Sequence, residues 1–94
     1  MEKRMFSLGQ TVTTRGIWNW MISDPRFCRE IDEAIQRHAS CDWGDLCEED
    51  KQMNDLSLYN NGRLLSAYDT NQGKIWIITE YDRSVTTILF PNEY

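Results

Sequence analysis

No apolar run in this 94-residue sequence approaches the roughly 18 to 20 residues that a membrane-spanning helix requires. The opening residues, MEKRMFSLGQ, include basic side chains but no apolar stretch behind them, so we expect no signal peptide. The three cysteines are an odd number, and nothing else in the sequence indicates export. We therefore expect a cytoplasmic protein whose thiols are free.

The familiar sequence signatures of catalysis are missing as well. There is no nucleophile elbow, no glycine-rich phosphate loop and no zinc-protease motif. The single histidine, His38, has no partner pattern that would indicate a catalytic triad. The sequence therefore indicates a non-enzymatic protein without a cofactor.

Apolar and aromatic residues are plentiful in this chain. Hydrophobic residues make up 40% of it and aromatic residues 12%, including four tryptophans. This content suffices for a globular core, and large rings usually lie inside a protein or in an interface. Residues 1–94 are thus expected to form one domain, without repeats or linkers.

The charge is unevenly distributed along the chain. Residues 1–40 carry six basic and five acidic residues, a formal charge of +1, whereas residues 41–94 carry four and ten, a charge of −6, which together give the net −5. Binding of nucleic acid through bulk positive charge is disfavoured by this balance. The acidic half is suited to a partner with a basic surface.

The N-terminal half reads as a strand followed by helices. Residues 6–14, FSLGQTVTT, favour a short edge strand, and residues 17–22 favour a buried helical stretch that is apolar on nearly all sides. Ser23, Asp24 and Pro25 are typical of a helix start. The second helix is predicted over residues 24–39, with one apolar face made by Phe27, Ile31, Ala34, Ile35 and His38.

The C-terminal third is rich in β-favouring residues. Strands are predicted over residues 63–68, 74–81 and 85–90, separated by turns at residues 69–73 and 82–84. The middle strand is apolar on both faces, and Trp76 is expected on the face away from the helices. The predicted fold is α+β, with an N-terminal strand and two to three helices packed on a C-terminal three-stranded antiparallel meander.

The most unusual stretch is CDWGDLCEED, residues 41–50, which contains five acidic residues. Asp45 and Glu48 have the spacing of a capping box, and Glu48, Glu49 and Asp50 suit the first turn of a helix. That helix is expected to bury Leu46, Met53 and Leu56 and to end at Asn61 and Gly62. In the loop before this helix, we expect Gly44 to allow a tight turn and the Trp43 side chain to pack in the core.

Two chemical readings of this region compete with the structural one. His38 with Cys28, Cys41 and Cys47 could be drawn as a zinc site, but the spacing matches no standard grouping, so we expect no metal. Alternatively, His38, Asp42 and Asp45 could serve a small metal-dependent hydrolase or nuclease, with Arg83 completing a polar cluster beside Asp42 or Asp45. These carboxylates crowd one helix start, whereas acid-base catalysis needs them opposed in a cleft.

Three segments together resemble a known family. They are TRGI at residues 14–17, HASCDWGDLCEEDKQMND at residues 38–55 and KIWIITEYDRSVTTILFPNEY at residues 74–94. They look like a family of small bacterial proteins carried on plasmids, phages and integrative elements, often labelled plasmid-related or, wrongly, type I restriction subunit M. The second label is rejected because such a subunit is far larger and carries a nucleotide-binding α/β domain.

The resemblance implies an accessory role in a mobile element. Small acidic proteins of such elements often block host defence nucleases, as anti-restriction and anti-CRISPR proteins do. We expect a protein-binding inhibitor of that kind whose partner, such as a CRISPR effector or a restriction enzyme, has a basic surface; no direct contact with nucleic acid or membrane is expected. The expected partner-binding residues are Asp42, Trp43, Asp45, Glu48, Glu49, Asp50 and Arg83. A structural homodimer joined through the sheet face that bears Trp76 is the remaining alternative.

Overall fold

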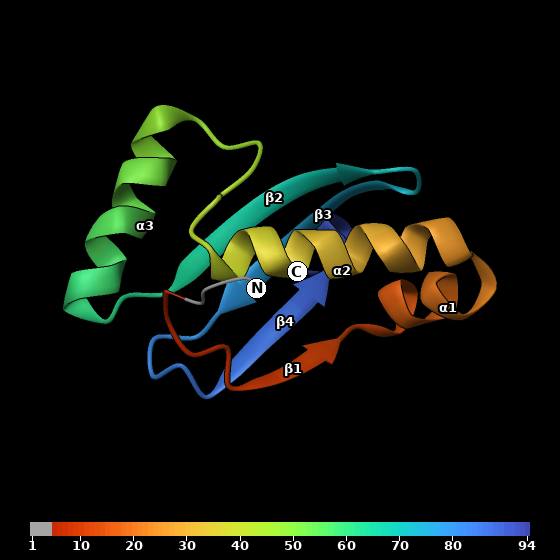
Figure 1. Ribbon diagram of the computed structural model, residues 1–94, viewed down its shortest axis with the longest axis horizontal. Helices are drawn as coiled ribbons and strands as arrows, with labels where there is room; N and C mark the ends of the chain where they lie inside the picture. The colour runs from red at the N-terminus through yellow and green to blue at the C-terminus, as the bar shows by residue number, and fades with distance from the viewer. Residues whose placement is uncertain (1–4) are drawn as a thin grey trace.

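The computed structural model describes residues 5–94, which form a four-stranded sheet and three α-helices. Figure 1 shows the longest helix lying across one face of the sheet and the third helix set to one side. The α+β fold predicted from the sequence is confirmed. The elements, in chain order, are β1 (Gln10–Thr13), α1 (Arg15–Ser23), α2 (Pro25–Ala39), α3 (Glu48–Asn60), β2 (Leu64–Thr70), β3 (Gly73–Thr79), β4 (Val85–Leu89) and the short 3-10 helix η1 (Pro91–Glu93).

The strands are arranged in the order β1-β4-β3-β2. β2, β3 and β4 form the expected antiparallel meander, with Tyr68 opposite Ile75 and Ile77 opposite Ile88. β1 lies at the edge, as expected, and pairs in parallel with β4 so that Gln10 is opposite Val85. The first and last strands of the chain are therefore neighbours, and β1 and β2 form the two outer edges.

The prediction for α2 is confirmed at both ends and on its inner face. Asp24 caps the helix by accepting hydrogen bonds from the backbone N–H groups of Arg26 (3.0 Å) and Phe27 (3.3 Å). The side chain of Asp24 also accepts from Gln72, in the β2–β3 turn, and this bond is the main reason that its pKa lies below the usual value. The apolar face fixes the helix on the sheet, where its buried residues are Phe27, Ile31, Ala34, His38 and Ala39.

The expectation that residues 17–22 are buried was wrong for most of them. Of this segment, now the body of α1, only Ile17 is fully buried, and Met21 packs against the core. Trp18, Trp20 and Ile22 are 54%, 44% and 66% exposed. Successive helical residues are about 100° apart, so one narrow contact with α2 and β4 covers only part of the helix.

Hydrogen bonds of Glu93 join the C-terminal residues to the start of α1. The Glu93 carboxylate accepts hydrogen bonds from the Thr14 hydroxyl (2.6 Å), the Gly16 N–H (3.1 Å) and the Phe90 N–H (2.9 Å). Burial acts to raise the pKa of Glu93, but these three donors outweigh it and lower the pKa. Thr14 is the N-cap residue of α1, but its side chain makes no capping hydrogen bond with the helix. Glu93 therefore caps the start of α1 instead.

The second face of the sheet, away from α2, carries Trp76. Trp76 is half-buried there and meets the Tyr94 ring edge-on at 5.8 Å, and Arg63 lies over that ring at 5.4 Å. Trp76 therefore has partners within its own chain.

Within residues 5–94, every helix is too short or too polar to cross a membrane.

Candidate protein-interaction surface

The loop between α2 and α3 closes the outer edge of β2. Gly44 forms a parallel bridge with Ala67, in which the Ala67 N–H donates to the Trp43 carbonyl (3.2 Å) and the Asp45 N–H donates to the Ala67 carbonyl (2.7 Å). Gly44 has a φ of +76°, and a Cβ there would lie 2.0 Å from the Ala67 carbonyl oxygen. Only glycine fits this approach, which confirms the prediction of a tight turn.

Trp43 lies in the core, as expected, and is 4% exposed. Its indole N–H donates to the Asp55 carboxylate of α3 at 3.0 Å, and its ring stacks at 6.3 Å from Phe6. Because the side chain is enclosed, Trp43 cannot contact a partner on the surface, and its place among the partner-binding residues was wrong.

The start of α3 differs from the expected capping box. The N-cap residue is Cys47, and its side chain makes no capping hydrogen bond. Asp45 instead forms an ion pair with Lys74 of β3, which lowers the pKa of the Asp45 carboxyl. The loop bridge on Ala67 holds Asp45 beside the sheet, so its side chain meets Lys74 rather than the N–H groups of α3. Glu48, Glu49 and Asp50 do occupy the first turn, as predicted.

α3 is attached to the sheet mainly by polar contacts. Its one fully buried residue is Asn54, whose side-chain amide donates to the Leu65 carbonyl (2.7 Å) and accepts from the Leu65 N–H (3.2 Å). The expected inner face was wrong, because Met53 and Leu56 are 61% and 57% exposed. Tyr59, on the same outward side, is 88% exposed.

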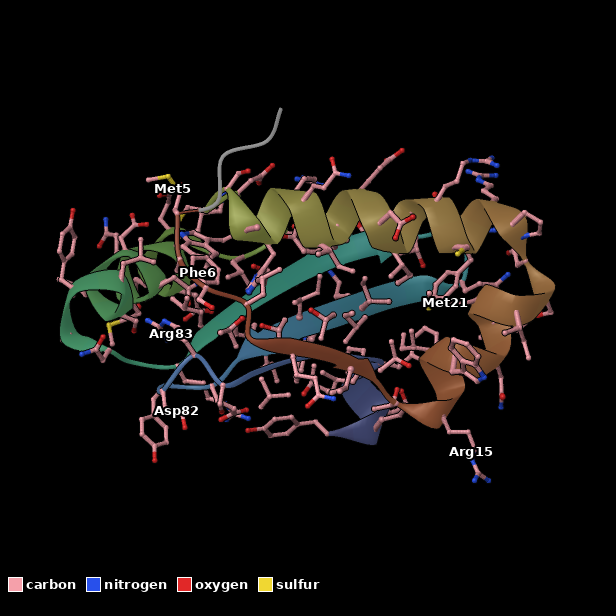
Figure 2. The ribbon with its side chains drawn as sticks, turned by 60° about the horizontal axis from the view of Figure 1, so that its bottom comes forward. Met5, Phe6, Arg15, Met21, Asp82 and Arg83 are labelled. Atoms are coloured by element: carbon pink, nitrogen blue, oxygen red, sulfur yellow. The ribbon has the colours of Figure 1, made fainter. Side chains whose placement is uncertain are left out.

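Arg83 is placed at the other end of α3, away from the predicted polar cluster. Its guanidinium donates to the carbonyls of Ser57 (2.9 Å), in the last turn of the helix, and Gly62 (2.6 Å), just beyond the end of the helix. Figure 2 shows Arg83 beside Phe6, and the guanidinium carbon lies 5.9 Å from the centre of that ring. Arg83 therefore holds the helix end in place, and the expected cluster with Asp42 or Asp45 is not formed.

Asp42 is also engaged within the chain. Arg37 at the end of α2 forms an ion pair with it, at 2.7 Å between Nε and Oδ2, and this contact lowers the pKa of the Asp42 carboxyl. With Asp42 and Asp45 each paired to a cation, the unpaired carboxylates of the predicted acidic patch are Glu48, Glu49 and Asp50. All three are exposed, and no ion pair within residues 5–94 involves them.

We call Glu48, Glu49, Asp50, Met53, Leu56 and Tyr59 the α3 surface. It combines carboxylates in the first turn with exposed apolar side chains along the rest of the helix. The sequence pattern predicts Met53 and Leu56 on an inner face and makes no prediction for Tyr59, so the apolar part of this surface is a finding of the structure. A signal was available: on a helical projection Leu56 and Leu58 lie on nearly opposite sides, so α3 has no single apolar face to bury.

His38 is enclosed in the core and fully hydrogen-bonded. The Thr86 hydroxyl donates to the Leu8 carbonyl at 2.6 Å, so it can only accept from Thr79, 2.7 Å away. The Thr79 hydroxyl must then accept from His38 Nε2 at 2.9 Å. His38 Nδ1 is left to accept from the Ser66 hydroxyl at 2.5 Å. This chain of bonds assigns the proton of the neutral ring to Nε2.

The surroundings of His38 lower the pKa of its imidazole. Burial lowers the pKa of the imidazole to about 4, and the positive charge of Arg83 acts in the same direction. The ring also meets Phe6 and Trp43 edge-on, at 5.3 and 5.7 Å between centroids. His38 thus joins α2 to three strands as a neutral core residue.

The geometry does not assemble the residues of the hydrolase alternative. His38 is inside the core, whereas Asp42 and Asp45 lie on the surface, each in its own ion pair. Across residues 5–94, no three side chains of the histidine, cysteine, aspartate and glutamate types are grouped to hold a metal ion. Cys28, Cys41 and Cys47 are free thiols.

No protein-family model, curated protein or solved structure matches this chain significantly. The family resemblance drawn from the three sequence segments is untested by these comparisons and stays a prediction.

Proposed function

We propose that this protein is a non-enzymatic protein-binding module that uses the α3 surface to occupy a basic groove on a partner protein. The observation that supports the proposal most directly is the state of the carboxylates. Within residues 5–94, Glu48, Glu49 and Asp50 are exposed and form no ion pair, while the neighbouring Asp42 and Asp45 pair with Arg37 and Lys74. The first turn of α3 thus carries three adjacent carboxylates.

Charge at this position suits the steering of a partner. Three carboxylates on one turn attract a basic surface over about a Debye length, roughly 8 to 10 Å at physiological ionic strength. Such attraction raises association rates more than it raises affinity. The carboxylates also interact favourably with the positive end of the α3 dipole, so the charge is stable in the free protein.

The apolar part of the α3 surface suits close contact after encounter. Met53, Leu56 and Tyr59 are among the most exposed large apolar side chains of the described chain. An amphipathic helix that enters a groove typically uses anchors at such helical spacings. Aromatic residues and methionine are enriched in the cores of protein interfaces.

The biological setting of the proposal comes from the family resemblance. A small acidic protein of a plasmid or phage that occupies a basic, nucleic-acid-binding groove would inhibit a host defence nuclease. We therefore propose an anti-CRISPR or anti-restriction role, with a CRISPR effector or restriction enzyme as the partner class. This step rests on likeness of size, charge and motifs.

The experiment is an affinity purification from the native host with quantitative mass spectrometry, using two matched charge-reversal variants. Glu48→Lys with Glu49→Lys alters the α3 surface. Asp32→Lys with Glu33→Lys makes the same change in net charge on the exposed side of α2. The partner captured by the natural protein should be lost with the first variant and kept with the second, and its capture should weaken as salt is raised.

Retention of the same partner by the α3 variant would show that these carboxylates are irrelevant. Loss of the partner with both variants would mean that net charge, rather than α3, governs binding. The inhibitory role is checked separately by adding the purified protein to the captured nuclease: cleavage should fall at stoichiometric amounts, and undiminished cleavage would exclude inhibition.

A further inference from the structure

The two outer edges of the sheet differ in how far their backbone groups are covered. On β2, the Asn54 amide occupies both backbone groups of Leu65, and the loop residues around Gly44 occupy those of Ala67. At the end of that edge, Asp69 carries a charge beside Lys74. Covering groups and charges are the usual means by which an edge strand is kept from pairing with another chain. The β2 edge is therefore closed.

Among the described residues, none covers or charges the β1 edge in this way. The N–H groups of Gln10 and Thr14 donate to Ser84 and Ile88 on the β4 side. Because peptide groups alternate in direction along a strand, those of Thr11 and Thr13 point away from the sheet. Within residues 5–94 no hydrogen bond engages these outward groups, and Figure 1 shows β1 as the lower border of the sheet with no ribbon beyond it.

The composition of this edge also permits pairing. Residues 9–14, GQTVTT, contain no charged side chain and no proline. Threonine and valine are among the residues that favour strands. Gln10 and Thr11 are exposed, and Val12 and Thr13 are half-buried, so described residues cover the strand only in part.

We propose that β1 is the site at which a second copy of this chain adds to the sheet, through antiparallel pairing of β1 with its twin. A two-fold axis at Val12 places Thr11 of one copy opposite Thr13 of the other. The outward N–H and C=O groups of these two residues then match, which gives four hydrogen bonds across the axis. The result is one continuous sheet of eight strands.

The charge distribution leaves this edge accessible to a second copy. Each chain has a net charge of −5, yet the approaching segments are uncharged, so like charges do not meet at the axis. The carboxylates of α3 lie on the side of β2, the opposite edge of the sheet. The dimer therefore carries its two α3 surfaces at its far ends, where repulsion is smallest.

The test combines the oligomeric state with amide exchange of the natural protein. Sedimentation or light scattering from roughly 1 µM to 1 mM, which spans weak to moderate dissociation constants, should show a rise from the 11.1 kDa chain to twice that mass. Over the same range, the amide hydrogens of Thr11 and Thr13 should become protected from exchange, while those of Gln10 and Val12, which face β4, stay protected throughout.

Two variants locate the contact. Val12→Lys brings two positive charges together at the axis and should leave a monomer. Thr87→Lys is the matched control, because Thr87 is the partner of Val12 one strand further into the sheet, and it should still dimerise. Thr11→Pro removes an outward donor without touching the ladder to β4 and should also give a monomer.

A monomer at every concentration, with fast exchange at Thr11 and Thr13, would overturn the proposal. A dimer that survives both Val12→Lys and Thr11→Pro would overturn it too, because the copies would then meet elsewhere. Protection of Thr11 and Thr13 in a particle of single-chain mass would likewise exclude the second copy as the occupant of this edge.

Discussion

Acidification is expected to destabilise this protein through His38. The chain contains a single histidine, and the folded protein holds it neutral, with Nε2 and Nδ1 both committed to hydroxyl groups. In the unfolded chain the same imidazole titrates near pH 6.5, whereas burial lowers its pKa in the folded protein to about 4. Between those pH values the unfolded state binds a proton that the folded state rejects.

The sign and size of the effect follow from this difference. Above pH 6.5 the imidazole is neutral in both states and its contribution to stability is complete. As the pH falls from 6.5 towards 4, the unfolded state gains the proton alone, and the free energy of unfolding decreases by up to 1.4 kcal/mol per pH unit. Over the whole window the loss is about 3 kcal/mol, a large part of the roughly 5 to 15 kcal/mol of a typical domain.

The assay is urea unfolding followed by tryptophan fluorescence at several pH values between 4 and 7, in parallel with the variant His38→Gln. The variant should be less stable at pH 7, and its stability should fall less steeply with acid, since its remaining slope comes from carboxylates alone. Parallel curves for the two proteins would refute the reasoning. So would an imidazole pKa near 6.5 measured by NMR on the folded protein.

Three further substitutions test the contacts that position the loop and helices. Asn54→Leu should lower the free energy of unfolding by about 1 to 3 kcal/mol and speed amide exchange in α3, because the backbone groups of Leu65 lose their partners; unchanged exchange would contradict an anchoring role. Gly44→Ala should cost about 2 kcal/mol or more in a thermal melt, since the left-handed φ and the Ala67 carbonyl both oppose a Cβ. Glu93→Ala should cost about 1 kcal/mol and loosen α1, seen as loss of amide protection at its first turn, because the cap is removed.

The sequence was most informative where local patterns and packing agree. The α2 boundaries followed from Asp24, Pro25 and a regular apolar face, and the meander followed from strong strands separated by turn residues. Asn61 ends α3 in the left-handed conformation, as its type suggests.

The errors arose where tertiary contacts override a local pattern. Asp45 has the spacing of a helix cap, but it pairs with Lys74, which lies in a strand almost thirty positions later. A local sequence pattern contains no information about so distant a partner. The sequence predicts Arg83 in a turn and in a binding site, whereas its side chain contacts the end of α3. The strands β2 and β3 separate that helix from Arg83 in the sequence. The parallel pairing of β1 with β4 is similarly non-local, so the sequence predicted an edge strand without its neighbour.

The union of the first strand with the last has a consequence for how the chain is made. Val12 and Thr87 are neighbours in the sheet but far apart in the sequence, so a nascent chain has its helices before its sheet can close. Pairings this distant in sequence are slow to form, because the intervening chain must be ordered first. Until β4 has emerged from the ribosome, the apolar faces of the growing meander are open to chaperones and to neighbouring nascent chains.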